Sequence, residues 1–189
     1  SRLLLQAPEG NGRRRALDKL RQEGVAQERV GFVPRLPRRQ YLELYHRIDL
    51  GLETLPYNGH TTSLDALWMG VPVVTLVGQT IVGRAGYSLL MNLNLPELIA
   101  RTVEEYVQTV AGLANDLPRL THLRATLRGR MEQSPLMDAP NFARSIEAAY
   151  REMVELSGQS RAPVIEVDGE VLADFGAEEL EAWWSKRGF

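Results

Sequence analysis

The chain contains no cysteine among its 189 residues. This absence excludes disulfides, thiolate zinc sites and cysteine nucleophiles. Histidine is also scarce: His46, His60 and His122 are the three present, and their spacing matches no metal-ligand pattern. No apolar run approaches the roughly 20 residues that a membrane helix needs, and no signal peptide is recognisable. We therefore expect no cofactor or metal ion, no membrane partner and a cytoplasmic location.

An excess of charge of one sign is missing too. The 22 Lys and Arg residues nearly balance the 24 Asp and Glu residues, which leaves a net charge of −2. Because nucleic-acid surfaces usually carry a basic excess, we expect no nucleic-acid partner. Hydrophobic residues make up 44% of the chain, enough for one domain with a real core plus an appendage. The chain begins at Ser1 in what reads as a strand, so we expect it to be part of a longer protein.

Short apolar runs alternate with helical patterns along most of the chain. Fully apolar strands alternating with helices are typical of parallel pairing with both sheet faces covered. With right-handed crossovers, this pattern predicts an α/β fold with a Rossmann-like, doubly wound parallel sheet. We expect one lobe over residues 1–156, followed by a linker, a hairpin with an Asp168-Gly169 turn and a short helix over 157–189. The strands are expected at 3–5, 30–33, 49–52, 73–76 and 98–100, and the helices at 13–24, 38–46, from 61, 84–92, 102–114, 117–133 and 142–156.

The stretch 57–70 is the most informative part of the sequence. Asn58-Gly59 breaks the chain after a strand, and a helical pattern begins at Thr61. A helix that starts at the carboxyl end of a strand offers unpaired N–H groups and a positive dipole end. Together with His60 and two threonine hydroxyls, it favours a phosphate or carboxylate ligand. The alternative is a threonine N-cap that closes an ordinary turn.

Other ligand-side positions each have two interpretations. Arg38 follows the second strand, where it contacts either an anion or base, or only solvent. Tyr41, one turn further along, either stacks on an aromatic ring or packs in the core. Asp65 lies on the same helical side as Thr61 and either binds a sugar hydroxyl or is solvated. Arg84 is by default a surface ion-pair residue. The sequence contains no Ser-His-Asp arrangement, P-loop or paired-carboxylate acid/base site.

Several of these stretches resemble one family. The similarity is carried by 48–54 (Ile-Asp-Leu-Gly-Leu-Glu-Thr), 57–62 (Tyr-Asn-Gly-His-Thr-Thr) and 65–75 (Asp-Ala-Leu-Trp-Met-Gly-Val-Pro-Val-Val-Thr), and it extends over about 2–156. In these residues the chain resembles the C-terminal half of the catalytic region of O-linked N-acetylglucosamine (O-GlcNAc) transferases, and bacterial members in particular. That resemblance implies the C-terminal lobe of a GT-B glycosyltransferase, which holds the sugar nucleotide.

The resemblance also implies roles for single residues. His60 would stabilise the UDP leaving group, and no general base can be named because that group and a family lysine near the phosphates would lie upstream of Ser1. Departures occur at Tyr41, where animal members carry histidine, at Leu44, where they carry arginine, and at Gly83, which replaces a serine beside Arg84. The residues that the resemblance places at the donor are His60, Thr61 and Thr62 for the diphosphate, Asp65 for the ribose, and Leu36, Arg38, Tyr41 and Leu44 for uracil.

The sequence therefore predicts the UDP-GlcNAc-binding lobe of an inverting, metal-independent protein O-GlcNAc transferase. Its partners would be a UDP-sugar, a Ser/Thr protein acceptor, and an N-terminal catalytic lobe with helical repeats upstream. The chain alone would be inactive. Two alternatives remain at this point. One is a related glycosyltransferase that uses GDP-fucose or UDP-glucose, and the other is a non-catalytic nucleotide-sugar-binding module.

Overall fold

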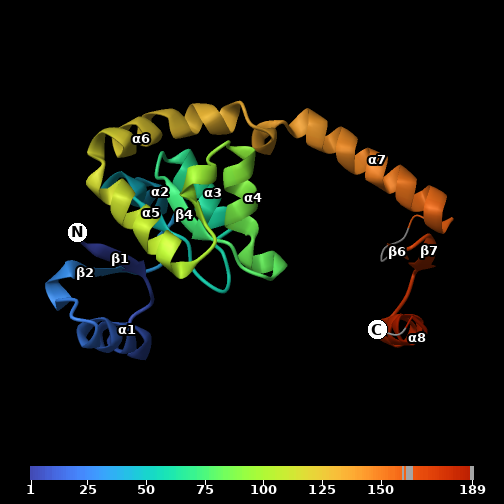
Figure 1. Cartoon of the computed structure of the whole chain (residues 1–189), viewed down its shortest axis with the longest axis horizontal. Coiled ribbons are helices and arrows are strands. Elements are labelled where there is room, and N and C mark those ends of the chain that lie inside the picture. The colour runs from blue at the N-terminus through green and yellow to red at the C-terminus, as the bar shows by residue number, and fades with distance from the viewer. Residues whose placement is uncertain (159, 161–163, 188–189) are drawn as a thin grey trace. The chain divides into compact units, whose positions relative to one another are not determined.

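The computed structural model describes residues 1–158, 160 and 164–187. Its contacts divide the chain into two compact units, Ser1–Leu136 and Met137–Phe189. Figure 1 shows the helices and strands of both units, labelled and coloured by their order in the chain. The first unit contains the parallel strands and the candidate site. The domain boundary after residue 156 stays a prediction, and within the predicted tail residues 159, 161–163 and 188–189 lie outside the described residues.

The first unit alternates strands and helices, as the apolar runs predict. Val30–Val33 and Val73–Leu76 match the expected bounds, and the other strands differ by one or two residues. The strands are β1 (Leu3–Gln6), β2 (Val30–Val33), β3 (Gly51–Leu52), β4 (Val73–Leu76) and β5 (Ile99–Ala100). The α-helices are α1 (Asn11–Gln22), α2 (Arg38–Leu44), α3 (Thr61–Trp68), α4 (Ala85–Asn92), α5 (Val103–Asn115) and α6 (Leu117–Glu132).

All strand pairs of this unit are parallel. β1 pairs with β2, and β3, β4 and β5 form a second group in that order. β4 contacts α3, α4 and α5, and these helices surround it in Figure 1. The first three residues of β4 are buried, which explains why its sequence is a continuous apolar run and not an alternating one. The predicted α/β class with parallel strands is confirmed.

The hydrophobic core lies around β4 and extends to α6, which packs on α3 and α5. The buried side chains of α6 have helical spacing, with one buried residue on each successive turn. The fully buried large side chains include Leu67, Leu90, Leu95, Leu98, Leu113, Leu127, Val71 and Val74. Because α3 and α4 pack in this core, each helix starts at a fixed position after the carboxyl end of β3 or β4.

One helix is capped at its expected start, and another helix is shorter than expected. The Thr102 side chain accepts from the Glu105 amide at 3.1 Å and caps the start of α5, where a helix over 102–114 was expected. The helix expected over 38–46 ends at Leu44, and a 3-10 turn, Tyr45–Arg47, follows. That turn brings the Tyr45 side chain inward, where it is buried.

The second unit consists of α7 (Ala139–Ser157), β6 (Val164–Val167), β7 (Glu170–Ala173) and α8 (Ala177–Ser185). β6 and β7 form the expected antiparallel hairpin around Asp168-Gly169. Arg187 links the hairpin to α8: its guanidinium lies 4.0 Å from the Trp183 ring centre and 2.5 Å from the Glu170 carboxylate. In the described residues no helix is long and apolar enough to cross a membrane.

Candidate functional site

The site begins where β3 ends and α3 starts. His60 is the N-cap residue, and its backbone has an unusual positive φ of 42°. Thr61 is the first helical residue. Among the described side chains none caps this helix, and Thr62 Oγ1 donates to the Gly59 carbonyl at 2.8 Å. The alternative of an ordinary threonine N-cap is therefore wrong, because neither threonine accepts a bond from the helix amides.

The exposed surface of this helix start belongs to three residues, His60, Thr61 and Thr62. The His60 ring lies 5.9 Å from the Tyr57 ring, centre to centre. Within the described part of the chain the Thr61 hydroxyl has no recorded hydrogen bond, so it is free to donate to a ligand. The Thr62 hydroxyl already donates its proton to the Gly59 carbonyl. The positive end of α3 thus presents an imidazole, one free hydroxyl and unpaired amides to solvent.

Glu53 lies directly beneath this helix start. It follows β3 and is 7% exposed. One carboxylate oxygen accepts from the Gly59 amide at 2.8 Å and the Thr54 amide at 3.3 Å. The other oxygen accepts from the Ser63 hydroxyl at 2.7 Å. The Glu53 carboxylate therefore accepts from the donors on the buried side of the turn, the Gly59 and Thr54 amides and the Ser63 hydroxyl. His60 and Thr61 remain exposed to solvent.

Asn58 joins the same turn to the start of α4. It is completely buried. Its amide group donates to the Thr54 carbonyl at 3.0 Å and accepts from the Gly86 amide at 3.1 Å. Gly86 has no room for a side chain, because a Cβ there would lie 2.4 Å from Thr75 Oγ1. The starts of α3 and α4 are consequently held at fixed positions by one buried amide side chain.

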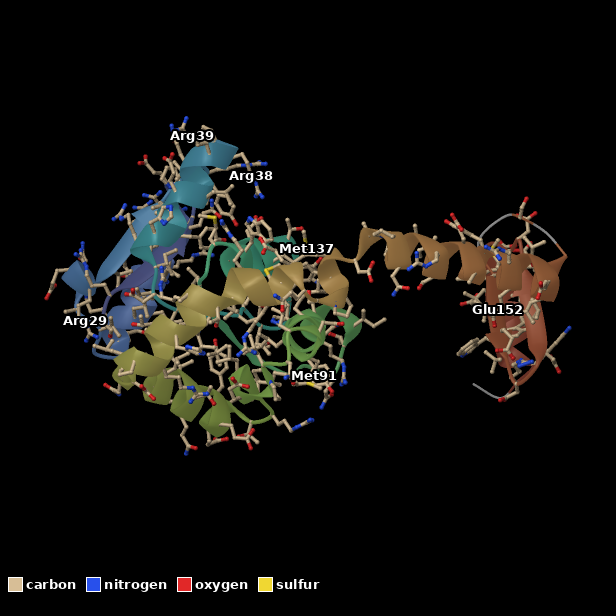
Figure 2. The ribbon with its side chains drawn as sticks, turned by 90° about the horizontal axis from the view of Figure 1, so that it is seen from above. Arg29, Arg38, Arg39, Met91, Met137 and Glu152 are labelled. Atoms are coloured by element: carbon tan, nitrogen blue, oxygen red, sulfur yellow. The ribbon has the colours of Figure 1, made fainter. Side chains whose placement is uncertain are left out.

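An ion pair connects α2 with α3. Both terminal nitrogens of Arg38 donate to the two Asp65 oxygens, each at 2.6 Å. The Asp65 side chain is 12% exposed, whereas the Arg38 side chain is 63% exposed. Figure 2 shows Arg38 and Arg39 at the exposed end of α2. The hydrogen bond to Asp65 raises the pKa of Arg38 further. The carboxylate is thus not simply solvated, and Arg38 stands between it and solvent.

Two tyrosines lie beneath this ion pair. The Tyr41 and Tyr45 hydroxyls are 2.5 Å apart, and Tyr45 donates to the Thr62 carbonyl at 3.2 Å. The rings meet edge to face, with centres 5.3 Å apart. The Arg38 guanidinium lies 5.6 Å from the Tyr41 ring centre. Burial raises the pKa of Tyr41 and of Tyr45, so both hydroxyls keep their protons at neutral pH.

The structure therefore brings together most of the residues singled out in the sequence. Arg38, Tyr41 and Asp65 form one cluster, and Tyr45 links it to the backbone of Thr62. Leu36 and Leu44 are half-buried near either end of α2, but no described contact joins them to that cluster. The roles expected for all eight residues at a donor stay predictions.

Four residues of the site had no assigned role in the sequence analysis: Glu53, Asn58, Ser63 and Tyr45. A carboxylate placed directly after a buried strand was the available signal for Glu53. The sequence indicates Asn58 as a turn residue, but its buried side-chain amide also hydrogen-bonds two backbone groups, the Thr54 carbonyl and the Gly86 amide. Nothing in the sequence pattern distinguishes Ser63 from an exposed helical serine. Arg84, which is exposed, lies 5.4 Å from the Tyr87 ring centre and has no recorded ion pair in the described residues.

A metal centre is not evident among the described residues, where no three His, Asp or Glu side chains lie together. His46 and His122 are both exposed, on the 3-10 turn after α2 and on α6. His60 is therefore the histidine that belongs to the candidate site.

Comparison with known proteins identifies close relatives of this unit. A family model described as Glycosyl transferase family 41 matches residues 3–146. A protein of Solanum lycopersicum, named probable UDP-N-acetylglucosamine--peptide N-acetylglucosaminyltransferase SPINDLY, is 41% identical over 142 residues, 75% of this chain and 15% of its own length. The UDP-N-acetylglucosamine--peptide N-acetylglucosaminyltransferase of Caenorhabditis elegans is 30% identical over 132 residues, 70% of this chain and 12% of its own length.

A solved structure agrees with these matches. It is a mutant of the Thermobaculum terrenum O-GlcNAc transferase, with 44% sequence identity and a TM-score of 0.75 over 80% of this chain and 30% of its own. The likeness confirms the predicted fold of the GT-B type. This chain spans 15% or less of the tomato and nematode relatives, so most of each relative has no counterpart in it.

Proposed function

Because the chain belongs to glycosyl transferase family 41, we propose that it is the donor-binding lobe of a protein O-GlcNAc transferase. The enzyme would transfer N-acetylglucosamine with inversion from UDP-N-acetylglucosamine to serine or threonine side chains of proteins. The names of the relatives support this donor and acceptor class. The N-terminal catalytic lobe, upstream helical repeats, a bacterial origin and a cytoplasmic location belong to the same proposal.

The observation that carries this proposal is the uncapped start of α3. It lies after the carboxyl end of β3, where parallel α/β sheets bind their ligands. His60 and Thr61 are exposed there, and Glu53 accepts from the Gly59 amide on the buried side of the turn. A diphosphate fits such a set of donors. The neighbouring pair of Arg38 and Asp65 would face the nucleoside.

The geometry also supports a chemical role for these donors. UDP is the leaving group when the sugar is transferred, and negative charge builds up on its β-phosphate as the bond to the sugar breaks. Donors aimed at that phosphate stabilise the transition state more than the ground state. His60 and Thr61 would supply this stabilisation from the protein itself. The general base would come from outside this chain.

A first test removes one hydroxyl donor. Thr61→Ala should weaken UDP binding to the full-length protein by about 1–2 kcal/mol, the usual worth of a hydrogen bond to a charged group. Thr62→Ala should have a similar effect, in part because its hydroxyl holds Gly59. Thr121→Ala on α6, also exposed, is the control. Calorimetric titration measures the affinities. Unchanged UDP affinity in a folded variant with His60, Thr61 and Thr62 all replaced would refute the phosphate site.

A second test concerns divalent ions. Because His60 and the helix start would neutralise the departing phosphate, activity of the full-length enzyme should survive EDTA. Initial rates of peptide glycosylation, with and without chelator, measure this. Loss of turnover with EDTA and recovery with Mg²⁺ or Mn²⁺ would contradict the proposed leaving-group stabilisation.

A further inference from the structure

Tyr45 occupies a position that the donor-binding roles do not use. It is 9% exposed and belongs to the 3-10 turn Tyr45–Arg47 directly after α2. Its hydroxyl lies between the Tyr41 hydroxyl, at 2.5 Å, and the Thr62 carbonyl, at 3.2 Å. A phenol has one proton to donate, and the Tyr45 proton goes to the carbonyl. The Tyr45 oxygen can then accept from Tyr41, so the two bonds connect Tyr41 through Tyr45 to the Thr62 carbonyl.

This chain is one of two hydrogen-bonded connections between α2 and α3 in the described residues. The other is the pair of 2.6 Å bonds from Arg38 to Asp65. One connection joins Tyr45, directly after α2, to Thr62 on α3. The other joins Arg38 on α2 to Asp65 on α3. Two separated connections fix both the distance and the rotation between the helices, which a single connection cannot do.

We propose that Tyr45 is a positioning residue that sets the nucleoside-facing side of α2 in register with the phosphate-facing start of α3. The inference rests on the proposed function, and it concerns a residue without ligand contact of its own. Tyr45 acts through Tyr41, whose ring lies under the Arg38 guanidinium, 5.6 Å from it. With the Tyr45 hydroxyl in place, Arg38, Tyr41 and Asp65 are held before the ligand arrives. Preorganisation of this kind lowers the cost of ordering side chains on binding.

The test uses Tyr45→Phe in the full-length protein, with Tyr106→Phe as the matched control. Tyr106, on α5, is half-buried and, like Tyr45, donates to a backbone carbonyl, that of Glu53, at 3.3 Å. Both variants lose one phenol hydroxyl, but only Tyr45 connects α2 with α3. Tyr45→Phe should weaken UDP and uridine binding by the same factor, about ten-fold, whereas Tyr106→Phe should leave both affinities unchanged. Calorimetry with UDP and uridine as probes gives the comparison.

Kinetics and a second variant complete the test. Since nucleoside contacts persist from the ground state to the transition state, Tyr45→Phe should raise the donor KM and leave kcat unchanged. Tyr41→Phe interrupts the same chain, and the double variant should lose no more affinity than the larger single loss. Wild-type affinities in Tyr45→Phe or Tyr41→Phe, with any loss confined to the Tm, would overturn this inference alone. Failure of the wild-type protein to bind UDP would overturn the proposed function itself.

Discussion

Replacing His60 with alanine in the full-length protein should lower kcat for sugar transfer by about 100-fold, the usual scale for losing one preorganised donor to a developing oxyanion. Donor affinity should fall by less than about three-fold, because the imidazole contributes most when charge builds up on the departing phosphate. The structure places this side chain at the exposed positive end of α3, without a capping group in the described residues. Steady-state kinetics with a peptide acceptor measure both parameters.

Two further variants separate chemistry from backbone strain at this position. His60 has a φ of 42°, which disfavours any residue with a Cβ. His60→Gly should therefore be more stable than His60→Ala by about 1 kcal/mol and equally slow. His122→Ala removes an exposed histidine on α6 and should retain full activity. A kcat of His60→Ala within two-fold of wild type would remove His60 from the mechanism.

The largest effect on folding is expected at Glu53. Glu53→Leu should lower the free energy of unfolding by about 3–5 kcal/mol, because it leaves the Gly59 amide and the Ser63 hydroxyl buried without their acceptor. Glu53→Gln keeps one acceptor oxygen and should cost about 1 kcal/mol. Urea unfolding of the full-length protein, with hydrogen exchange followed on peptides that cover 53–63, measures the change and its location.

A surface glutamate provides the control for that measurement. Glu43 pairs with Arg39 at 2.9 Å on the outside of α2, and its side chain is 55% exposed. Glu43→Leu should change stability by less than about 0.5 kcal/mol, since solvent screens such pairs. Equal losses in Glu43→Leu and Glu53→Leu would mean that the buried carboxylate does not anchor the turn.

The fold was largely predictable because its signals are local. Continuous apolar runs such as Val73–Leu76 indicate strands buried on both faces, and the pattern after Thr61 has helical spacing. Thr102 at the start of α5 follows a rule that depends on four consecutive residues. Each of these features requires no knowledge of distant parts of the chain.

The sequence singled out His60, Thr61, Arg38 and Asp65 as polar residues near the carboxyl ends of strands, and their role at a ligand stays a prediction. The contacts beneath them could not be predicted. The bonds from Arg38 to Asp65 span 27 residues of sequence, and the bond from Gly86 to Asn58 spans 28. Periodicity carries no information on such pairs, because they form only when the core has fixed α2, α3 and α4. Tyr45 is a further case, since a 3-10 turn, and not the expected helix, directs its side chain inward.

The buried position of Asn58 and Glu53 has a consequence for how this family can diversify. These two side chains hold the loop's shape from the inside, whereas the His60, Thr61 and Thr62 side chains are exposed, and of these only Thr62 bonds the loop backbone in the described residues. Exposed positions of this kind tolerate substitution at small cost in stability. Substitutions at these exposed positions can therefore change the contacts offered to a ligand while the buried side chains keep the shape of the loop. The buried scaffold and the exposed ligand contacts of this helix start are thus carried by different side chains, so each can change with little effect on the other.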